Sequence, residues 1–584
     1  MKHSSIFKKL FLKKLTLKNF VYRFLSVFAF VSLCTYAVTD VFYTEKTFYQ
    51  GVHFTIFCIC LFFLTLLLFF IQNEKTIRIL FLISSSIYLI IGSVYVKDTF
   101  MSFGFCLLIC MAIFYTETDD LPFTFQNKYI LICVSSLLAI AFILHTSVTA
   151  ALHYLNFGSP CFDFGIFSQM YYSMQTTGKA VTTCERDMVL HHFAVHFSPI
   201  YYVLLPFYML FPTPITLLVA QSVLIASGII PILLLCKHFQ FTDLQSLCFA
   251  IGFLFFPAFS GACTYYFHEN CFLVPLLLWF LYFMERENKI GSILLAICLL
   301  CVKEDAAVYV AVISLYFLVC KKQIKPSLCI FSLSILSFIV ITQCMEVFGQ
   351  GIMSDSRYGD YIYDDKGLFS VIKSVIQNPF FALKHIFSEE KIKFLLQMLL
   401  PFCFLPCCIR KPTKLILWIP FVLLHLMTNY PYQYDIHFQY IFGTGAILQY
   451  LAIANFADFK HKKEIPKVLL CMALSSVLMW STGEMSRWNY VQQFKNESSI
   501  RGNIKEAISL VPKDASVSAS TFFIANMSQR DKLYELEKTK QETDYVVLDL
   551  RPHKDVIAKE KFENNSFEEI YFEEHQVAVY KRIQ

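Results

Sequence analysis

The stretch ILICVSSLLAIAFILHTSVTAALHYLNFGSPCFDFG, residues 130–165, decides the fold class, because a long apolar run leads directly into a loop that carries a charge. The run from Ile130 to Leu152 is long enough to cross about 30 Å of hydrocarbon as a helix. The loop then presents Phe162-Asp163-Phe164-Gly165. Charge is costly inside a bilayer, so an ionisable residue beside a membrane span indicates a reaction site or a substrate path.

The whole chain shares this apolar character. Of its 584 residues 57% are hydrophobic and only 16% are charged, and the mean hydropathy is +0.56. A soluble chain of this length would carry more charge, so the composition predicts an α-helical polytopic membrane protein. We expect about 15 spans, with runs such as Phe272 to Met284 either spanning or forming buried or re-entrant helices. The longer apolar cores are Phe30 to Phe42, Ile56 to Ile71, Ile79 to Val96, Ile130 to Leu152, Ile215 to Cys236, Pro326 to Val347 and Val468 to Trp480.

Basic residues predict the orientation, because positively charged loops stay on the cytoplasmic side during insertion. Residues 1–23 contain seven lysines and arginines and no acid, so we expect a cytoplasmic arm and an uncleaved first span. Alternating the spans from there places the basic loop Lys321 to Lys325 inside. The same alternation places four polar clusters outside, provided that Ile200 to Phe211, with its prolines, does not span. The clusters are Phe162 to Gly165, His191 to His196, His268-Glu269 and Lys303-Glu304-Asp305.

This alternation gives three regions: the arm at 1–23, a transmembrane domain at 24–482 with outer loops at about 153–198 and 349–391, and an extracytoplasmic α/β domain at 483–584. In the last region Ala515 to Ala519 and Tyr545 to Asp549 are predicted strands. Ile504 to Leu510 and, more weakly patterned, Ile524 to Leu536 are predicted helices. The C-terminus is therefore expected outside.

Several classes of function are excluded by what the sequence lacks. It contains no Gly-rich phosphate loop and no stripe of basic residues, so neither a nucleotide-driven pump nor a nucleic-acid partner is expected. Most of the 21 cysteines lie in apolar stretches, where cysteine is a small buried hydrophobe. Cys161, Cys184 and Cys263 fall at the outer face, where a disulfide is an open alternative.

The polar motifs also resemble a known family. Asn156-Phe157, Phe162 to Gln169, His196-Phe197-Ser198-Pro199, Phe267-His268-Glu269 and Lys303-Glu304-Asp305-Ala306 match, in spacing and order, a group of bacterial predicted membrane proteins described as a domain of unknown function. That group is similar to the GT-C superfamily, multi-spanning glycosyltransferases that take a sugar from a polyprenyl-phosphate carrier at the outer membrane face. The resemblance covers roughly Asn156 to Ile441, with weaker matches at Arg357-Tyr358 and His437.

The resemblance implies a catalytic role for Asp163. Attack of an acceptor hydroxyl on an anomeric carbon needs a carboxylate to take the proton, opposite a leaving phosphate that cations or donors stabilise. GT-C enzymes carry their acidic residue in the first large outer loop, where Asp163 lies. Its aromatic neighbours could desolvate it and raise its pKa. The alternative is that Asp163 is only the N-cap of a helix running to Met174.

The other clusters have a functional and a structural interpretation each. Glu304 and Asp305, with Lys303 beside them, shape the acceptor site, bind a divalent ion together with Asp163, or form a salt bridge at a hairpin tip. His268 and Glu269 occupy the equivalent turn between two earlier spans, which would bring them to the same membrane depth as Glu304 and Asp305. The alternative is that they are an interfacial histidine and acid exposed to water. No certain cofactor is implied.

The histidines and an arginine are candidates for binding the substrate. His191, His192 and His196 lack the Glu between helical histidines that zinc enzymes use, so we predict no metal there and expect hydrogen bonds to a phosphate or sugar instead. Arg357 is the candidate for gripping two phosphate oxygens, with Tyr358 and His437 as the weaker matches. Its alternative is a surface pair with Asp355 or Asp360.

The sequence therefore predicts a GT-C-like glycosyltransferase in the plasma membrane, moving a sugar from a polyprenyl-phosphate donor to a glycan, lipid or protein acceptor outside. The rival class is a secondary transporter or flippase using the same carboxylates and histidines. Transporters usually place such groups near the bilayer midplane and show paired repeats. Here the groups gather at one boundary and no repeat is visible. An assembly protein would leave the acidic turns without a role.

Overall fold

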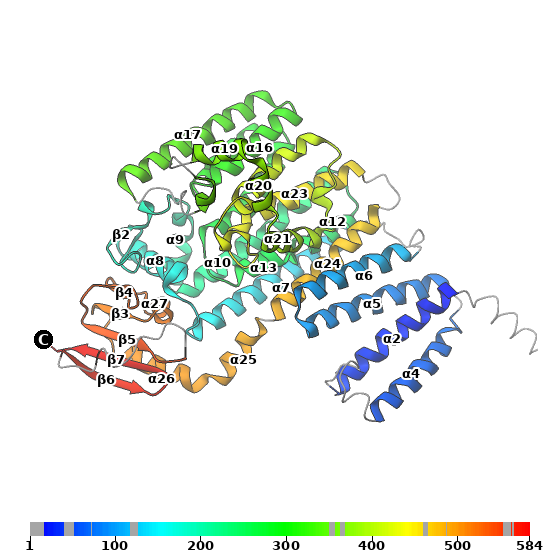
Figure 1. The fold of residues 1–584 in the computed structure, drawn as a ribbon, viewed down its shortest axis with the longest axis horizontal. Helices are drawn as coiled ribbons and strands as arrows, with labels where there is room; N and C mark the ends of the chain where they lie inside the picture. The colour runs from blue at the N-terminus through cyan, green and yellow to red at the C-terminus, as the bar shows by residue number, and fades with distance from the viewer. Residues whose placement is uncertain are drawn as a thin grey trace, which may run out of the picture.

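The computed structural model describes residues 17–39, 52–71, 73–116, 126–349, 357–362, 368–459, 465–485, 487–552, 562 and 566–583. Most of the basic arm, at residues 1–16, lies outside them. The described chain is mostly helical, with a small sheet near the C-terminus (Figure 1). Within it seven helices are long and apolar enough to cross a membrane. Such helices, in a chain of this composition, are typical of a multi-pass α-helical membrane protein.

An N-terminal group of helices forms one edge of the molecule. These helices are α2 (Leu17–Thr39), α4 (Val52–Leu68), α5 (Glu74–Val96) and α6 (Thr99–Tyr115). In Figure 1 α2 and α4 lie farthest from the sheet, while α5 and α6 lie along α24 (Ile465–Met485). Tyr22, Phe81 and Ile109 share a buried cluster with Leu478 of α24, so packing joins this group to the rest of the membrane region.

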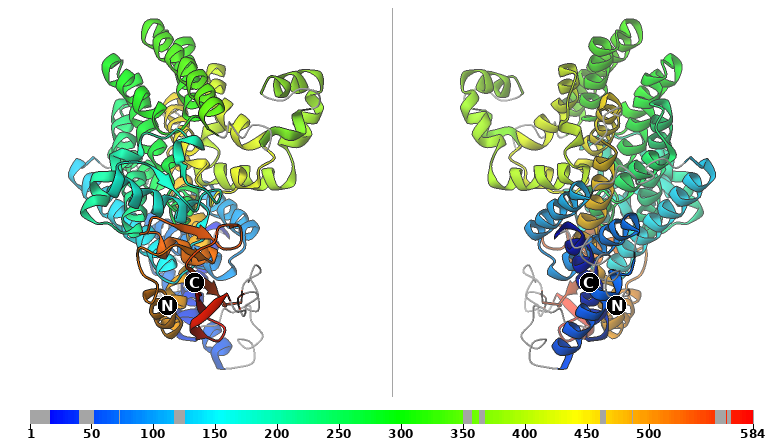
Figure 2. Two further views of the ribbon diagram at one scale, coloured as in Figure 1. Left: turned by 90° about the vertical axis from the view of Figure 1, so that its left-hand side faces the viewer. Right: turned by 90° about the vertical axis from the view of Figure 1, so that its right-hand side faces the viewer.

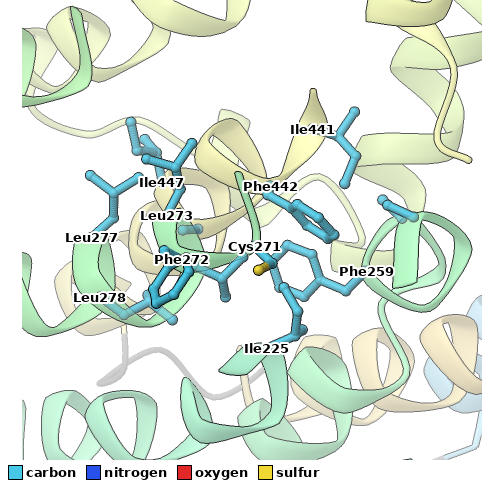
Figure 3. Close-up of a cluster of buried hydrophobic side chains, with 14 of the residues drawn as sticks. Ile225, Phe259, Cys271, Phe272, Leu273, Leu277, Leu278, Ile441, Phe442 and Ile447 are labelled. Carbon is cyan, nitrogen blue, oxygen red and sulfur yellow. The ribbon is translucent and has the colours of Figure 1, made fainter. Parts of the chain in front are cut away.

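The central body buries the largest apolar core. Its helices are α7 (Lys128–Leu155), α10 (Pro214–Ser227), α11 (Ile229–His238), α12 (Asp243–Leu254), α13 (Pro257–Cys263), α14 (Leu273–Glu285), α15 (Lys289–Leu300), α16 (Ala306–Cys320), α17 (Ile324–Phe348) and α23 (Ile441–Phe459). Ile225, Phe259, Leu278 and Phe442 meet in this core from four helices (Figure 3).

Helix α23 is surrounded on all sides. A Cβ on Gly443 would lie 2.4 Å from the Tyr309 ring, and one on Gly445 would lie 2.6 Å from the Phe259 ring. Small residues at such positions let helices approach closely, which matters in lipid because dispersion contacts rather than the hydrophobic effect hold helices together. These two glycines therefore bring α16 and α13 against α23.

Prolines break the chain into short helices beside the site. Segment 400–434 consists of η5 (Leu400–Phe402), η6 (Leu405–Cys407), η7 (Pro412–Trp418), α22 (Ile419–Phe421), η8 (Val422–Leu426) and η9 (Pro431–Tyr434). Five of these six elements have a proline in their first turn, where its missing N–H costs nothing and its ring blocks extension of the preceding helix. Helix α9 (Tyr201–Leu210) contains Pro206, and its ten residues span about 15 Å, too short to cross a bilayer.

The predicted second outer loop also contains short helices. They are η4 (Gly359–Tyr361), α19 (Leu368–Gln377), α20 (Pro379–Ile386) and the start of α21 (Glu389–Leu399). Tyr361 donates to His385 Nδ1 at 2.9 Å or accepts from it, and Lys391 donates to the Leu426 carbonyl at 2.7 Å. The first bond joins two parts of the loop, and the second ties the loop to the proline-rich segment.

The C-terminal unit is a five-stranded mixed sheet with two helices, α26 (Ser498–Ser509) and α27 (Thr521–Met527), joined to α24 through α25 (Trp488–Asn496). The strands are β3 (Val517–Ala519), β4 (Leu533–Glu535), β5 (Tyr545–Asp549), β6 (Phe567–Glu573) and β7 (Val577–Arg582), in the order β4-β3-β5-β7-β6. Strand β3 runs parallel to β4 and β5, while β7 is antiparallel to β5 and β6.

The predicted elements of this unit are found, with one error. Tyr545 to Asp549 is a strand, the first predicted strand is present as Val517–Ala519, and the first predicted helix is present as α26. The predicted helix over Ile524 to Leu536 ends at Met527, because Leu533 to Glu535 form the edge strand β4 beside β3. Pairing with a neighbouring strand overrode the weak helical pattern.

The unit packs directly on the loop that follows α7. Val517, Phe523, Ile524 and Val547 share one buried cluster with residues of the helical body. Those residues are Phe157, Cys161, Ile166 and Cys184. Figures 1 and 2 show the strands at the end of the molecule that carries α8 (Ile166–Thr177) and the hairpin of β1 (Val181–Thr182) and β2 (Leu190–His191).

Candidate functional site

Two adjoining cavities lie at the end of the helical body next to the C-terminal unit. The first, the Asp163 cavity, has a volume of about 470 Å³, and the second, the Asp305 cavity, about 330 Å³. Both are walled by Val195, His196, Arg357 and Tyr440, so they meet at these four residues. Among the predicted site residues, the first cavity is lined by Asp163, His192, His196, His268 and Arg357, and the second by His196, Lys303, Glu304, Asp305, Arg357 and Tyr358.

Asp163 projects from η1 (Cys161–Gly165), an irregular turn between α7 and α8. Its backbone has φ 63° and ψ −78°, a conformation that an L residue adopts only when its surroundings enforce it. The N-terminus of α8 has Gly165 as its cap and no capping side chain, so the alternative that Asp163 is an N-cap is wrong. The carboxylate instead accepts a long 3.5 Å hydrogen bond from Gln439 Nε2.

The C-terminal unit helps to hold this turn. The Cys161 N–H donates to Thr521 Oγ1 at 3.1 Å. A Cβ on Gly165 would come within 2.8 Å of Ile524 Cγ2, so α27 packs against the backbone of the turn itself. Arg551 donates to the carbonyls of Asn156 and Phe157 at 3.2 and 2.8 Å. Asn156 and Phe157, the first residues of the family motif, therefore serve to dock the unit beside Asp163.

The protonation of Asp163 depends on its surroundings. Burial raises the pKa of Asp163 to about 7; nearby Lys303 and His192 act against this rise, and Glu269 and Glu185 add to it. A carboxyl with a pKa near neutrality can take a proton and give it up again at physiological pH. This is the property that a general base requires.

Behind the Asp163 cavity lies a buried chain of hydrogen-bonded titratable groups. His192 Nδ1 lies 2.8 Å from Glu185 Oε2, and His192 Nε2 lies 3.2 Å from the Tyr201 hydroxyl. Tyr201 donates to Glu269 Oε2 at 2.8 Å. Glu269 is also 3.2 Å from Lys303 Nζ.

Neighbouring charges shift the protonation of two groups in this chain, Glu269 and His192. Burial disfavours the charged form of Glu269, but neighbouring cations, Lys303 among them, outweigh it and lower the pKa of Glu269. Burial likewise opposes a charged His192, yet Glu185 raises the pKa of His192. For His268 burial dominates and lowers the pKa, which favours a neutral ring on the cavity wall. Glu269 itself lines neither cavity and supports those that do.

The acidic turn between α15 and α16 serves the second cavity. His196 Nδ1 lies 2.8 Å from Glu304 Oε1 and outweighs burial to lower the pKa of Glu304. Burial raises the pKa of Asp305. Among the described residues, Glu304 Oε2 and Asp305 Oδ1 are buried with no hydrogen-bond partner. Buried oxygens without a partner are energetically costly, so both carboxylates keep the capacity to accept further hydrogen bonds.

Arg357 stands where the two cavities meet. Its guanidinium carbon lies 4.6 Å from the ring centre of Tyr430 and 5.1 Å from that of Tyr440. Its buried Nη1 has no hydrogen-bond partner among the described residues. Two aromatic faces hold the cation without consuming its donors. Asp355 is not among the described residues, and no ion pair with Asp360 is present in the part of the chain described, where Asp360 pairs with His385.

Two predicted residues lie elsewhere. His191 accepts from the Phe193 N–H at 3.3 Å as the cap of η2 (His192–Ala194), and His437 pairs with Asp435 at 2.7 Å with almost half of its side chain exposed. Neither lines either cavity. The structure adds residues that sequence reasoning missed, namely Glu185, Tyr201, Tyr430, Gln439, Tyr440, Glu535 and Lys538. Glu185 lies six residues before His191 and Gln439 two residues after His437, whereas Tyr201, Glu535 and Lys538 have no sequence signal.

The three cysteines predicted at the outer face form no disulfide in the structure. Cys161 and Cys184 line the Asp163 cavity as free thiols, and Cys263 is buried and free. Within the described residues, no group of three or more His, Cys, Asp or Glu side chains is arranged to hold a metal ion. The divalent cation stays a prediction.

Comparison with known proteins identifies a family. A family model described as "Predicted membrane protein (DUF2079)" matches residues 152–577. ArnT from Cupriavidus metallidurans bound to undecaprenyl phosphate is similar in structure at 12% identity and a TM-score of 0.46, covering 76% of this chain and 98% of ArnT. Its apo form gives 11% identity, a TM-score of 0.41 and coverages of 76% and 97%. No curated protein sequence matches the chain.

Proposed function

The chain belongs to the DUF2079 family of predicted membrane proteins, and we propose that it is a GT-C-type glycosyltransferase that moves a sugar from a polyprenyl-phosphate carrier to an acceptor. The observation that carries the proposal is the position of Arg357, which lines both the Asp163 cavity and the Asp305 cavity. A candidate base and a candidate phosphate clamp thus line the same cavity.

The Asp305 cavity suits the carrier. Apart from the acidic turn and Arg357, its lining is largely apolar and includes Phe338 and Met345 from α17 and Leu423 and Leu424 from η8. Helix α17 is one of the seven long apolar helices and is mostly exposed on its outer surface, so in a membrane it faces lipid. An apolar cavity beside a lipid-facing helix can take isoprene units while a cation at its inner end takes the phosphate.

The chemistry then follows from the geometry. The acceptor hydroxyl gives its proton to Asp163, and its oxygen forms a bond to the anomeric carbon. The bond from that carbon to the carrier phosphate oxygen breaks, and the electron pair leaves with the phosphate. Arg357 and the histidines stabilise this negative charge, Arg357 best because its guanidinium can bind two oxygens at once. Glu304 and Asp305 fix the turn that shapes the space between donor and acceptor.

The membrane orientation of the site is part of the proposal. The basic N-terminal arm and the loop Lys321 to Lys325 favour a cytoplasmic location for those segments. The turn that carries Glu304 and Asp305 lies at the other end of α16 from this loop. The site and the C-terminal unit are therefore extracytoplasmic.

The test is transfer of radiolabelled sugar from a panel of polyprenyl-phosphate sugars in membranes that contain the full chain. We compare the wild type with Asp163→Asn, Glu304→Gln and Arg357→Gln at equal abundance. Asp435→Asn is the matched control, because Asp435 is also an acid at this end of the molecule but lines neither cavity. We expect Asp163→Asn to abolish transfer and Asp435→Asn to retain it.

Other outcomes have clear meanings. Transfer that is unchanged in Asp163→Asn and Glu304→Gln would overturn the site. No transfer by the wild type with any donor would favour the transporter or flippase, which would use the same carboxylates and histidines.

A further inference from the structure

One wall of the Asp163 cavity belongs to the C-terminal unit. Glu535, the last residue of β4, and Lys538, in the turn that follows, line the same cavity as Asp163 and His192. Sequence position gives no hint of this, since more than 370 residues separate Lys538 from Asp163. A substrate that reaches Asp163 thus contacts both parts of the molecule.

This wall is held in place by bonds to the helical body. The carboxylate of Asp187 accepts from the Lys540 N–H at 2.8 Å and from the Thr539 hydroxyl. Thr183 Oγ1 accepts from the Leu533 N–H at 2.9 Å and donates to the Leu533 carbonyl at 2.7 Å. The edge strand β4 and the turn after it are therefore fixed against the first loop, so Lys538 keeps a defined position.

The rim of the cavity combines an aromatic face with charge. Phe162 is 56% exposed, although it lies in a buried turn, and Lys538 Nζ lies 5.9 Å from its ring centre. Lys538 is also held by Glu535, at 2.7 Å, and 60% of its side chain remains exposed. An exposed ring flanked by a fixed cation and a carboxylate offers both a flat apolar surface and strong hydrogen-bonding groups at one place.

Carbohydrate is the chemical class that fits this pair of features. A sugar ring has an apolar face of C–H groups that stacks on an aromatic ring, while its hydroxyls hydrogen-bond with charged side chains at the edge. A lipid tail would remove water from Glu535 and Lys538 without offering either of them a hydrogen bond, which is unfavourable. The apolar lining suited to a tail lies in the other cavity.

We propose that Phe162, Glu535 and Lys538 form a subsite that binds a sugar residue of the acceptor, so that the acceptor is a glycan and enters between the helical body and the C-terminal unit. This inference rests on the proposed function and narrows its acceptor from glycan, lipid or protein to carbohydrate. Phe162 supplies the stacking surface, and Lys538 and Glu535 orient the ring so that one hydroxyl points to Asp163.

The experiment measures glycan binding by the purified full chain, independently of transfer. The probes are immobilised oligosaccharides, each presented free and as the headgroup of a glycolipid. Wild type is compared with Lys538→Gln and Phe162→Ala. Lys540→Gln is the matched control, because Lys540 lies in the same turn with an exposed side chain but does not line the cavity.

We expect wild type and Lys540→Gln to bind the same glycan, and Lys538→Gln and Phe162→Ala to bind it about tenfold more weakly or worse. Binding of both presentations would mean that the sugar alone is recognised, and binding of only one would identify the source of the acceptor. Wild type that binds no carbohydrate, or binding unaffected by Lys538→Gln and Phe162→Ala, overturns the subsite. Glycan binding without transfer would sink the proposed function and leave the subsite standing.

Discussion

At the scale of single residues, the site depends on groups whose charge is set by neighbours far away in sequence. Asp163 is influenced by Lys303, Glu269, His192 and Glu185, which come from three other segments. None of these influences can be read from the sequence around Asp163. What the sequence does provide is the aromatic setting of Phe162-Asp163-Phe164-Gly165, which predicts partial desolvation and hence a raised pKa.

The raised pKa of Asp163 predicts the pH dependence of transfer. Because burial raises the pKa of Asp163 to about 7, the base form is lost as pH falls through about 7, and the rate should fall with it. We expect the pH–rate profile of the wild type to show this acidic limb and that of Asp435→Asn to keep it. A profile that stays flat down to pH 5 would contradict the assignment of Asp163 as base.

The same shift has a consequence for stability, with a definite sign. The pKa of Asp163 is higher in the folded protein than its ordinary value of 3.8, so the folded state binds more protons between about pH 4 and pH 7. Its contribution to stability is therefore lost as pH rises through this window. Thermal unfolding of Asp163→Asn should lack this loss, so the variant should gain stability relative to the wild type as pH rises from 4 to 7.

Tyr201 is buried between two titratable groups, so replacing it should affect both stability and transfer. Its hydroxyl joins His192 and Glu269. In Tyr201→Phe both partners lose a hydrogen bond in a buried place, which should cost about 1–3 kcal/mol of stability. Transfer should also fall, with a shifted pH profile, since His192 and Glu269 act on Asp163. Tyr208→Phe, about two turns later in α9, is the control, because the buried Tyr208 hydroxyl has no hydrogen-bond partner among the described residues. Equal effects of both changes would mean that Tyr201 acts only through packing.

At the scale of elements, the sequence predicted the helices and strands whose conformation is determined by their own residues. Strand β5 and helix α26 were predicted because their own residues carry the pattern. Strand β4 was mistaken for helix because only its pairing with β3 makes Leu533 to Glu535 extended. The N-cap interpretation of Asp163 failed for a related reason, since the turn is shaped by contacts with α27 rather than by the start of α8.

In the candidate site, too, the sequence predicted some residues and missed others. Four polar clusters were predicted to gather at one boundary, and Asp163, His196, His268 and Lys303, one from each cluster, do line two adjoining cavities. Their chemical roles stay predictions. The sequence could not predict that Lys538 and Glu535 line the cavity. A charged residue in a small α/β unit has the pattern of any solvated surface residue until the position of the unit against the helical body is known.

The contact between Gly165 and α27 predicts how the two elements are coupled. A Cβ at Gly165 would lie 2.8 Å from Ile524 Cγ2, so Gly165→Ala should cost about 1–3 kcal/mol and disturb Asp163. Ile524→Ala in the same chain should recover part of both the stability and the transfer. Gly502→Ala in α26 is the control: nothing lies within 4 Å, and alanine should be neutral or slightly stabilising there. Additive losses in the double variant, measured by thermal unfolding, would show that the two residues do not interact.

At the scale of the whole molecule, the membrane body and the C-terminal unit form one functional object. The unit's own buried cluster includes Phe157, Cys161, Ile166 and Cys184 from the helical body. A separately folded recruitment domain would not need these residues, nor would it place Lys538 in the Asp163 cavity. The interface therefore favours a catalytic part for the unit over the assembly role that the sequence left open.

Because the C-terminal unit lines the Asp163 cavity, the proposed function requires the unit to lie on the outer side of the membrane. Helix α16 has 15 residues and spans about 22 Å, with Asp305 at its start and Lys321-Lys322 just after its end. Because basic loops are kept inside, Lys322 should be cytoplasmic and Lys540 extracytoplasmic. In intact cells, a membrane-impermeant maleimide of high mass should add one adduct to Lys540→Cys beyond the wild-type background and none to Lys322→Cys. After permeabilisation both variants should gain one adduct. The reverse pattern would place the site in the cytoplasm, where carriers bearing their sugar outside could not reach Asp163.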